Sequence, residues 1–110
     1  MDNSKLNQTV ARYNIGQLVH DALFDFRGVI IDVDATYQET EELYNRMAPN
    51  KPPKDKPWYH VLVHGTQQRV YICEQDLEPD LTLEPINHPE INYFFSDFKE
   101  GKYIPHSPRN

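Results

Sequence analysis

Residues 57–73 read PWYHVLVHGTQQRVYIC, and this stretch decides the fold of the chain. Two runs dense in β-branched and aromatic residues, 57–64 and 69–73, flank the segment 65–68, which suits a short hairpin loop. Strand alternation divides the first run into two faces: Tyr59, Val61 and Val63 on one, and His60, Leu62 and His64 on the other. The pattern predicts a half-buried β-hairpin, which needs further strands to cover its apolar face.

We expect those covering strands on both sides of the hairpin in the sequence. The first lies near residues 13–20, the second at 26–34 and a closing strand at 81–86. Gly28, inside the second strand, indicates a bulge or a close backbone approach. Together these strands predict a small closed β-barrel. Five side chains are expected to meet inside it: Tyr59, Val61, Val63, Val29 and Ile31.

The sequence as a whole predicts a mainly β domain, to which the remaining segments add a short helix, loops and a C-terminal tail. Thr40, followed by two glutamates, favours a short helix within residues 36–47, and the loop at 48–57 is rich in proline and lysine. Residues 74–79 suit a turn or a single helical turn. We expect a flexible N-terminus at 1–11, the barrel at 12–86, and an aromatic C-terminal tail at 87–110 that packs on the barrel.

Composition favours one small domain in a reducing compartment. The chain has 110 residues, a hydrophobic fraction of 38% and a mean hydropathy of -0.76. No run approaches the roughly 20 apolar residues of a membrane span, and the start of the chain lacks the apolar segment of a secretory signal. The single cysteine forms no internal disulfide, which suits a cytoplasmic protein.

Charge is distributed unevenly along the chain, whose net charge is -6. Residues 43–69 carry five bases and one acid, whereas residues 70–98 carry seven acids and no base. A local basic segment can bind a polyanion even on an acidic protein. The candidate nucleic-acid contacts are therefore Arg27, Lys51, Lys54, Lys56, Trp58 and Arg69. Trp58 either caps the end of the barrel or offers a flat face to a base or a peptide.

The sequence predicts neither an enzyme nor a metal site. His60 and His64 lie about 13 Å apart if both are on one strand, too far to share an ion at bond lengths of roughly 2.1 Å. Cys73 lies beside Glu74 and Asp76, which disfavour a reactive thiolate. Four glycines leave little room for a phosphate-binding loop. We expect no catalytic residue, no metal and no cofactor.

Four motifs resemble the HspQ family of small heat-shock proteins, also described as the YccV-like or hemimethylated-DNA-binding domain. They are IGQLVH at 15–20, FRGVIIDVD at 26–34, PWYHV at 57–61 and YICEQDL at 71–77. The resemblance covers roughly residues 12–84. It implies an SH3-like β-barrel and two activities: binding of hemimethylated DNA, and assistance in the degradation of particular or denatured proteins under heat stress. Cys73 stands where a small residue is expected, so no family role is carried over to its thiol.

These inferences predict a non-enzymatic stress-response module that acts as a protease adaptor or regulator. Its expected partners are an ATP-dependent protease, unfolded client proteins or both, because the strand edges of a small barrel can accept a peptide strand. Hemimethylated DNA is the alternative partner, and no membrane is expected. Leu62 and Tyr71, beside His60 on the second face of the hairpin, leave self-association open.

Overall fold

The predicted hairpin lies at the centre of the fold. In the computed structural model, which describes residues 10–47 and 51–107, β3 (Trp58–Val63) pairs antiparallel with β4 (Arg69–Cys73). The other elements in chain order are β1 (Leu18–Asp21), β2 (Phe26–Asp34), α1 (Glu41–Met47), the 3-10 turn η2 (Glu74–Asp76), β5 (Leu77–Pro79), α2 (Ile91–Phe94), β6 (Phe95–Lys99) and β7 (Lys102–Pro105). The mainly β fold class, the hairpin and the strand at 26–34 are confirmed. Most of the predicted flexible N-terminus, 1–11, lies outside the described residues.

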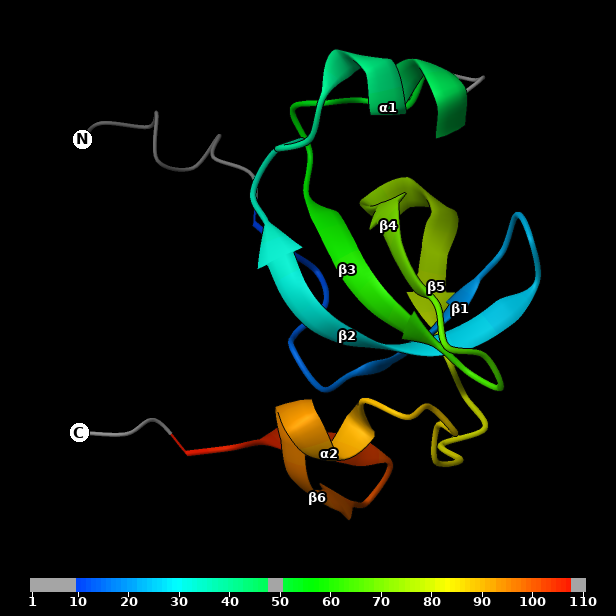
Figure 1. The fold of residues 1–110 in the computed structure, drawn as a ribbon, viewed down its shortest axis with the longest axis vertical. Coiled ribbons are helices and arrows are strands. Elements are labelled where there is room, and N and C mark those ends of the chain that lie inside the picture. Colours follow the sequence, from blue (N-terminus) through cyan, green and yellow to red (C-terminus); the bar gives the residue numbers. More distant parts are fainter. Residues whose placement is uncertain (1–9, 48–50, 108–110) are drawn as a thin grey trace.

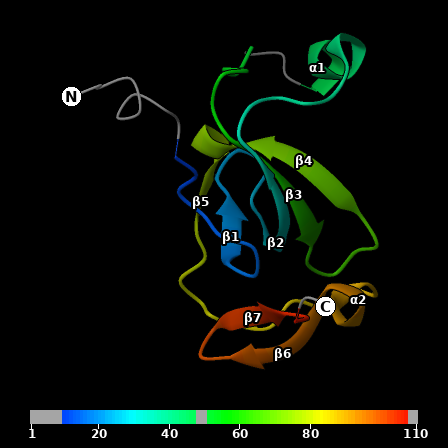
Figure 2. The same cartoon turned by 90° about the vertical axis from the view of Figure 1, so that its left-hand side faces the viewer.

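Five strands form one antiparallel sheet in the order β4-β3-β2-β1-β5, and β6 and β7 form a second sheet of two strands. The larger sheet is strongly curved, and β4 and β5 are its two edges (Figures 1 and 2). Within the described residues each of these edge strands has a partner on one side only. Strand pairing therefore does not close the sheet into the predicted barrel.

The predicted closing strand at 81–86 is wrong. The strand that follows the hairpin is β5, which pairs with β1 through Asp21 opposite Leu77. Beyond β5 the chain leaves the sheet, and Leu81 is 87% exposed. The first strand is also shorter than predicted. Gly16 (φ 93) bends the chain before it, so that regular pairing begins at Leu18.

The predicted distribution of side chains between the two faces of the sheet is wrong for Val29, whereas Tyr59 and Val61 lie on one face as predicted. Val29 pairs with Leu62 and Ile30 pairs with Val61, so Val29 and Val61 lie on opposite faces. A bulge at Ile31 then shifts the register between β2 and β3. One extra residue reverses the faces of all that follow it.

Gly28 shows why β2 and β3 lie so close together. A Cβ atom built on Gly28 would lie 2.4 Å from Val61 Cγ1 and 2.6 Å from the Leu62 carbonyl oxygen. Real Cβ atoms do not approach other atoms so closely, so only glycine fits here. The predicted close backbone approach is confirmed.

Both faces of the sheet are buried, not one. On the concave face Tyr59 and Val61 pack with Tyr13 and Leu77. The opposite face is covered at one end by α1 and its flanking loops, and at the other by α2, β6 and β7 (Figures 1 and 2). A sheet with two apolar faces needs a cover on each, and the segment after residue 87 supplies part of the cover on one face.

The C-terminal segment is joined to the sheet by packing and by hydrogen bonds. Phe95 and Tyr103 belong to the same buried cluster as Leu18 and Leu62. The Tyr103 N–H donates to the Gly16 carbonyl (2.9 Å), which fixes β7 beside the start of β1.

The structure has two short helices where the sequence predicted one. In α1 the Leu43 N–H donates to Thr40 Oγ1 (3.1 Å), and Glu41 and Glu42 lie in the first turn, as predicted. The four-residue helix α2 was not predicted, because its run Ile91–Phe94 is too short to show a helical period. No helix in the described ranges 10–47 and 51–107 has the length and apolarity to span a membrane.

Replacing Phe95 tests whether the C-terminal segment contributes to the stability of the sheet. We expect Phe95→Ala to lower the free energy of unfolding by about 3–5 kcal/mol, because it leaves a cavity against Leu18 and Leu62. The matched control Tyr93→Ala removes a ring that is 77% exposed and should change stability by no more than about 0.5 kcal/mol. Chemical denaturation measures both variants. Equal small effects would contradict the packing described here.

Candidate functional site

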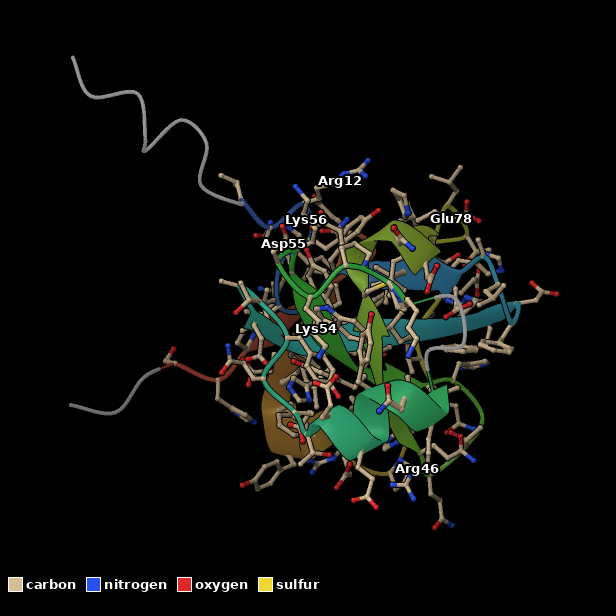
Figure 3. All side chains as sticks on the ribbon, turned by 90° about the horizontal axis from the view of Figure 1, so that it is seen from above. Arg12, Arg46, Lys54, Asp55, Lys56 and Glu78 are labelled. Atoms are coloured by element: carbon tan, nitrogen blue, oxygen red, sulfur yellow. The ribbon has the colours of Figure 1, made fainter. Side chains whose placement is uncertain are left out.

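The basic residues of the central segment gather at the end of the molecule formed by α1 and residues 51–57. We call this region the basic end. It comprises Arg12, Arg46, Lys51, Lys54 and Lys56. Figure 3 shows Arg12 and Lys56 together at one side, Lys54 nearer α1, and Arg46 on α1 itself. Arg12, which the sequence reasoning did not select, lines a shallow pocket with Lys56.

Two of these lysines are held by neighbouring groups. Lys54 forms an ion pair with Glu41, and its ammonium lies 4.3 Å from the centroid of the Tyr44 ring. Lys51 donates to Asn45 Oδ1 (3.1 Å) and lies 5.7 Å from the same ring. Their charges are therefore partly engaged in holding the 51–57 loop against α1, whereas Arg12 and Lys56 are exposed.

Trp58 does not offer a face to a ligand. Its side chain is 2% exposed, and its Nε1–H donates to the Pro53 carbonyl (3.0 Å). The Tyr37 ring packs edge-on at 4.8 Å between centroids, and the Tyr71 ring stacks at 5.2 Å. Of the two roles considered from the sequence, the structure supports the capping role: Trp58 joins α1 and its loops to β3 and β4.

Arg27 and Arg69 lie away from the basic end. Arg27 Nε donates to Asp80 Oδ2 (2.7 Å). Burial raises the pKa of Asp80, but hydrogen bonds from Arg27 and Thr82 outweigh it and hold that pKa below its ordinary value. Arg69 is bound by both carboxylate oxygens of Glu90, at 2.8 and 2.9 Å. The six predicted residues therefore do not form one site: only Lys51, Lys54, Lys56 and Trp58 come together.

The structure also has a second surface, a groove along β4, that was not predicted from the sequence. An open groove of about 410 Å³ runs along β4, between the turn that joins β1 to β2 and the Pro52 region beside α1. Leu23 and Phe24 form part of its wall and are 56% and 71% exposed. Two large apolar residues in the short turn at 22–25 are the sequence signal that could have revealed this exposed apolar surface.

Cys73 lies at the groove but is buried and unreactive in character. Burial, and then the neighbouring Asp76, raise the pKa of its thiol to about 12. Its Sγ donates to Asp76 Oδ2 (3.3 Å). The thiol therefore stays protonated near neutral pH, as the sequence reasoning expected from the flanking acids.

One group of side chains within the described residues has the spacing of metal ligands: Asp32, Asp34 and His60, whose ligand atoms lie within 4.8 Å of one another. Asp34 Oδ2 already accepts from the Tyr71 hydroxyl (2.7 Å) and lies 3.3 Å from His60 Nε2. Asp32 Oδ1 accepts from the Val33 N–H (2.9 Å). These hydrogen bonds explain why the three side chains lie close together. They form a network that joins β2, β3 and β4 across the sheet.

The described residues form a small, mainly β domain with a basic end and an apolar groove. A family model described as "Hemimethylated DNA-binding protein YccV like" matches residues 11–102. The chain belongs to this YccV-like family, as its motifs had indicated. The match extends past the predicted domain end at residue 86 and includes α2 and β6, which cover one face of the sheet.

The raised pKa of Cys73 predicts a protected thiol. We expect a disulfide reagent at pH 8 to label the native protein at least about a hundredfold more slowly than the urea-unfolded protein, because few thiolates form and the sulfur is buried. Asp76→Asn removes the carboxylate that is the second cause of the raised thiol pKa, and it should modestly speed labelling of the native protein. Comparable native and unfolded rates would reveal an accessible thiol and contradict this description.

Proposed function

We propose that this chain is a non-enzymatic binding module that captures unfolded protein segments and helps to deliver them to an ATP-dependent protease. One observation carries the proposal: the apolar groove along β4 with Leu23 and Phe24 exposed at its rim. Exposed apolar side chains around a concave surface are typical of protein-binding sites. The resemblance to stress proteins that assist degradation supports this choice of client.

The absence of an enzymatic role is part of the same proposal. The two surfaces of the described chain contain no nucleophile paired with a base that would activate it. Cys73 is the obvious candidate nucleophile, and its raised pKa opposes that role. We also retain the SH3-like barrel as the proposed architectural class, which the resemblance and the five antiparallel strands support.

A binding assay with an unfolded protein tests the groove. We expect the wild-type protein to bind a permanently unfolded, reduced and carboxymethylated lactalbumin, and Phe24→Ser to weaken that binding by about tenfold, since it removes about 1.4 kcal/mol or more of apolar contact. Fluorescence anisotropy of the labelled client gives the affinity.

The matched control for Phe24 is Tyr93→Ser, which removes another exposed aromatic ring, on α2, that does not line the groove. It should bind the client like the wild type. Equal losses in both variants, or no binding of the unfolded client by the wild type, would refute the proposal.

Duplex DNA is a second candidate partner, favoured by the family description and by the basic end. Arg12 and Lys56 are exposed there and line one pocket, which Glu74 also lines. The two basic side chains are the groups in this pocket that are suited to contact phosphates. Reading a methyl group requires an element in the major groove. The helix at this end, α1, has seven residues and begins with Glu41 and Glu42, which repel phosphate. The geometry therefore supports phosphate contact better than methylation readout.

A paired charge reversal tests the DNA hypothesis. We expect Arg12→Glu with Lys56→Glu to weaken duplex binding and to reduce the slope of log affinity against log salt by about 2, because two phosphate contacts are lost. The control Lys99→Glu with Lys102→Glu makes the same charge change on β6 and β7. Anisotropy titrations with unmethylated, hemimethylated and fully methylated duplexes measure both effects. Equal losses in the two double variants would exclude a specific contact at the basic end.

A further inference from the structure

The edge of β4 that faces away from β3 carries peptide groups without a neighbouring strand. At the end of the hairpin the Val63 N–H donates to the Gln68 carbonyl (3.1 Å). Antiparallel pairs alternate between hydrogen-bonded and non-hydrogen-bonded positions, so Val70 and Ile72 form the bonds to β3. The N–H and C=O groups of Arg69 and Tyr71 therefore point to the open edge, where no other described strand pairs with β4. Cys73 ends this edge, because it is 1% exposed and its C=O caps the 3-10 turn η2.

The groove surrounds this edge from both faces of the sheet. Phe24 and Phe26 line it on the concave side, together with Val70 of β4. Leu43 and Pro52 line it on the α1 side. Side chains of a strand alternate between two faces. An extended chain paired with β4 would therefore place successive apolar side chains against the two walls in turn, with its backbone on the exposed peptide groups.

The charges at the two ends of the groove favour a basic ligand residue at one end. Arg69 lines the groove at the start of β4, but its guanidinium is bound by both oxygens of Glu90. At the other end Asp21 and Asp76 line the groove beside Cys73, and Asp76 is partly exposed. The net charge presented to a ligand is negative, which favours lysine or arginine over glutamate at that end.

We infer that β4 is a strand-addition site for an extended segment of consecutive apolar residues that carries a lysine or arginine beside Asp76. In antiparallel pairing the basic residue is the first residue of the segment, because a strand antiparallel to β4 begins at the Cys73 end. The inference rests on the proposed capture of unfolded segments and specifies how they bind. Unfolded chains expose such segments, whereas folded proteins bury them.

A peptide that lacks the required donors tests the backbone contact on the unaltered protein. The probe is a fluorescent peptide of about six residues, long enough to span β4, with lysine first and then alternating valine and tyrosine. We expect the same peptide with alternate backbone nitrogens methylated to bind about three- to tenfold more weakly per pair of lost hydrogen bonds. A peptide with glutamate in place of the lysine should also bind more weakly.

The complementary variant is Arg69→Pro, which removes one outward N–H at the exposed start of an edge strand, where proline is tolerated. Arg69→Ala is its matched control, since it removes the same ion pair with Glu90 and keeps the N–H. We expect Arg69→Pro to bind the peptide about threefold or more weakly than Arg69→Ala. Thermal unfolding of both variants verifies that they are folded.

Three results would overturn the inference: equal affinity for the methylated and unmethylated peptides, equal affinity for the lysine and glutamate peptides, or a wild-type dimer that binds no peptide. The last outcome, found by light scattering, would make a second copy of the chain the occupant of β4. In any of these cases the proposed function would still stand if Phe24→Ser binds unfolded lactalbumin more weakly than the wild type does. Failure of the wild type to bind that client would refute the proposed function itself.

Discussion

The structure depends on the burial of β3 from both sides. Val61 and Leu62 are neighbours in the chain, point to opposite faces and are both fully buried. A strand with two buried faces needs strands on both sides and a cover on each face. Here β2 and β4 supply the strands, and Gly28 lets β2 approach without a Cβ atom in the way. Tyr13, Phe95 and Tyr103, which lie outside the central strands β2, β3 and β4, are therefore part of the core.

This arrangement limits where a ligand can bind. The convex face is covered at one end by the aromatic cluster around Trp58 and at the other by the cluster around Phe95. The concave face is filled by Tyr13 and Leu77. Neither face of the sheet is left for recognition, so binding falls to edges and loops. The groove beside β4 and the basic end are the two such places with a distinct chemical character, one apolar and one cationic.

Local sequence patterns predicted the parts of the fold that depend on local structure. The hairpin, the strand at 26–34 and the Thr40 cap follow from strand alternation and capping chemistry. The face assignment of Val29 failed, because the register between β2 and β3 includes a bulge that no periodicity reveals. The prediction of the candidate contacts was wrong in part because it too depends on residues that are distant in the sequence. Arg69 looks free in the sequence, but its partner Glu90 lies 21 positions away.

An open strand edge beside an apolar groove is a liability as well as a binding site, because it can pair with another copy. β4 carries features that limit such pairing. It has five residues, so few hydrogen bonds are available, and Arg69 places a charge at its first position. The groove walls rise on both sides of the edge, with Phe24 on one and Leu43 on the other. A flat sheet edge from a folded neighbour fits poorly between two walls, whereas a single extended chain fits along them. The same geometry therefore supports the proposed preference for unfolded segments.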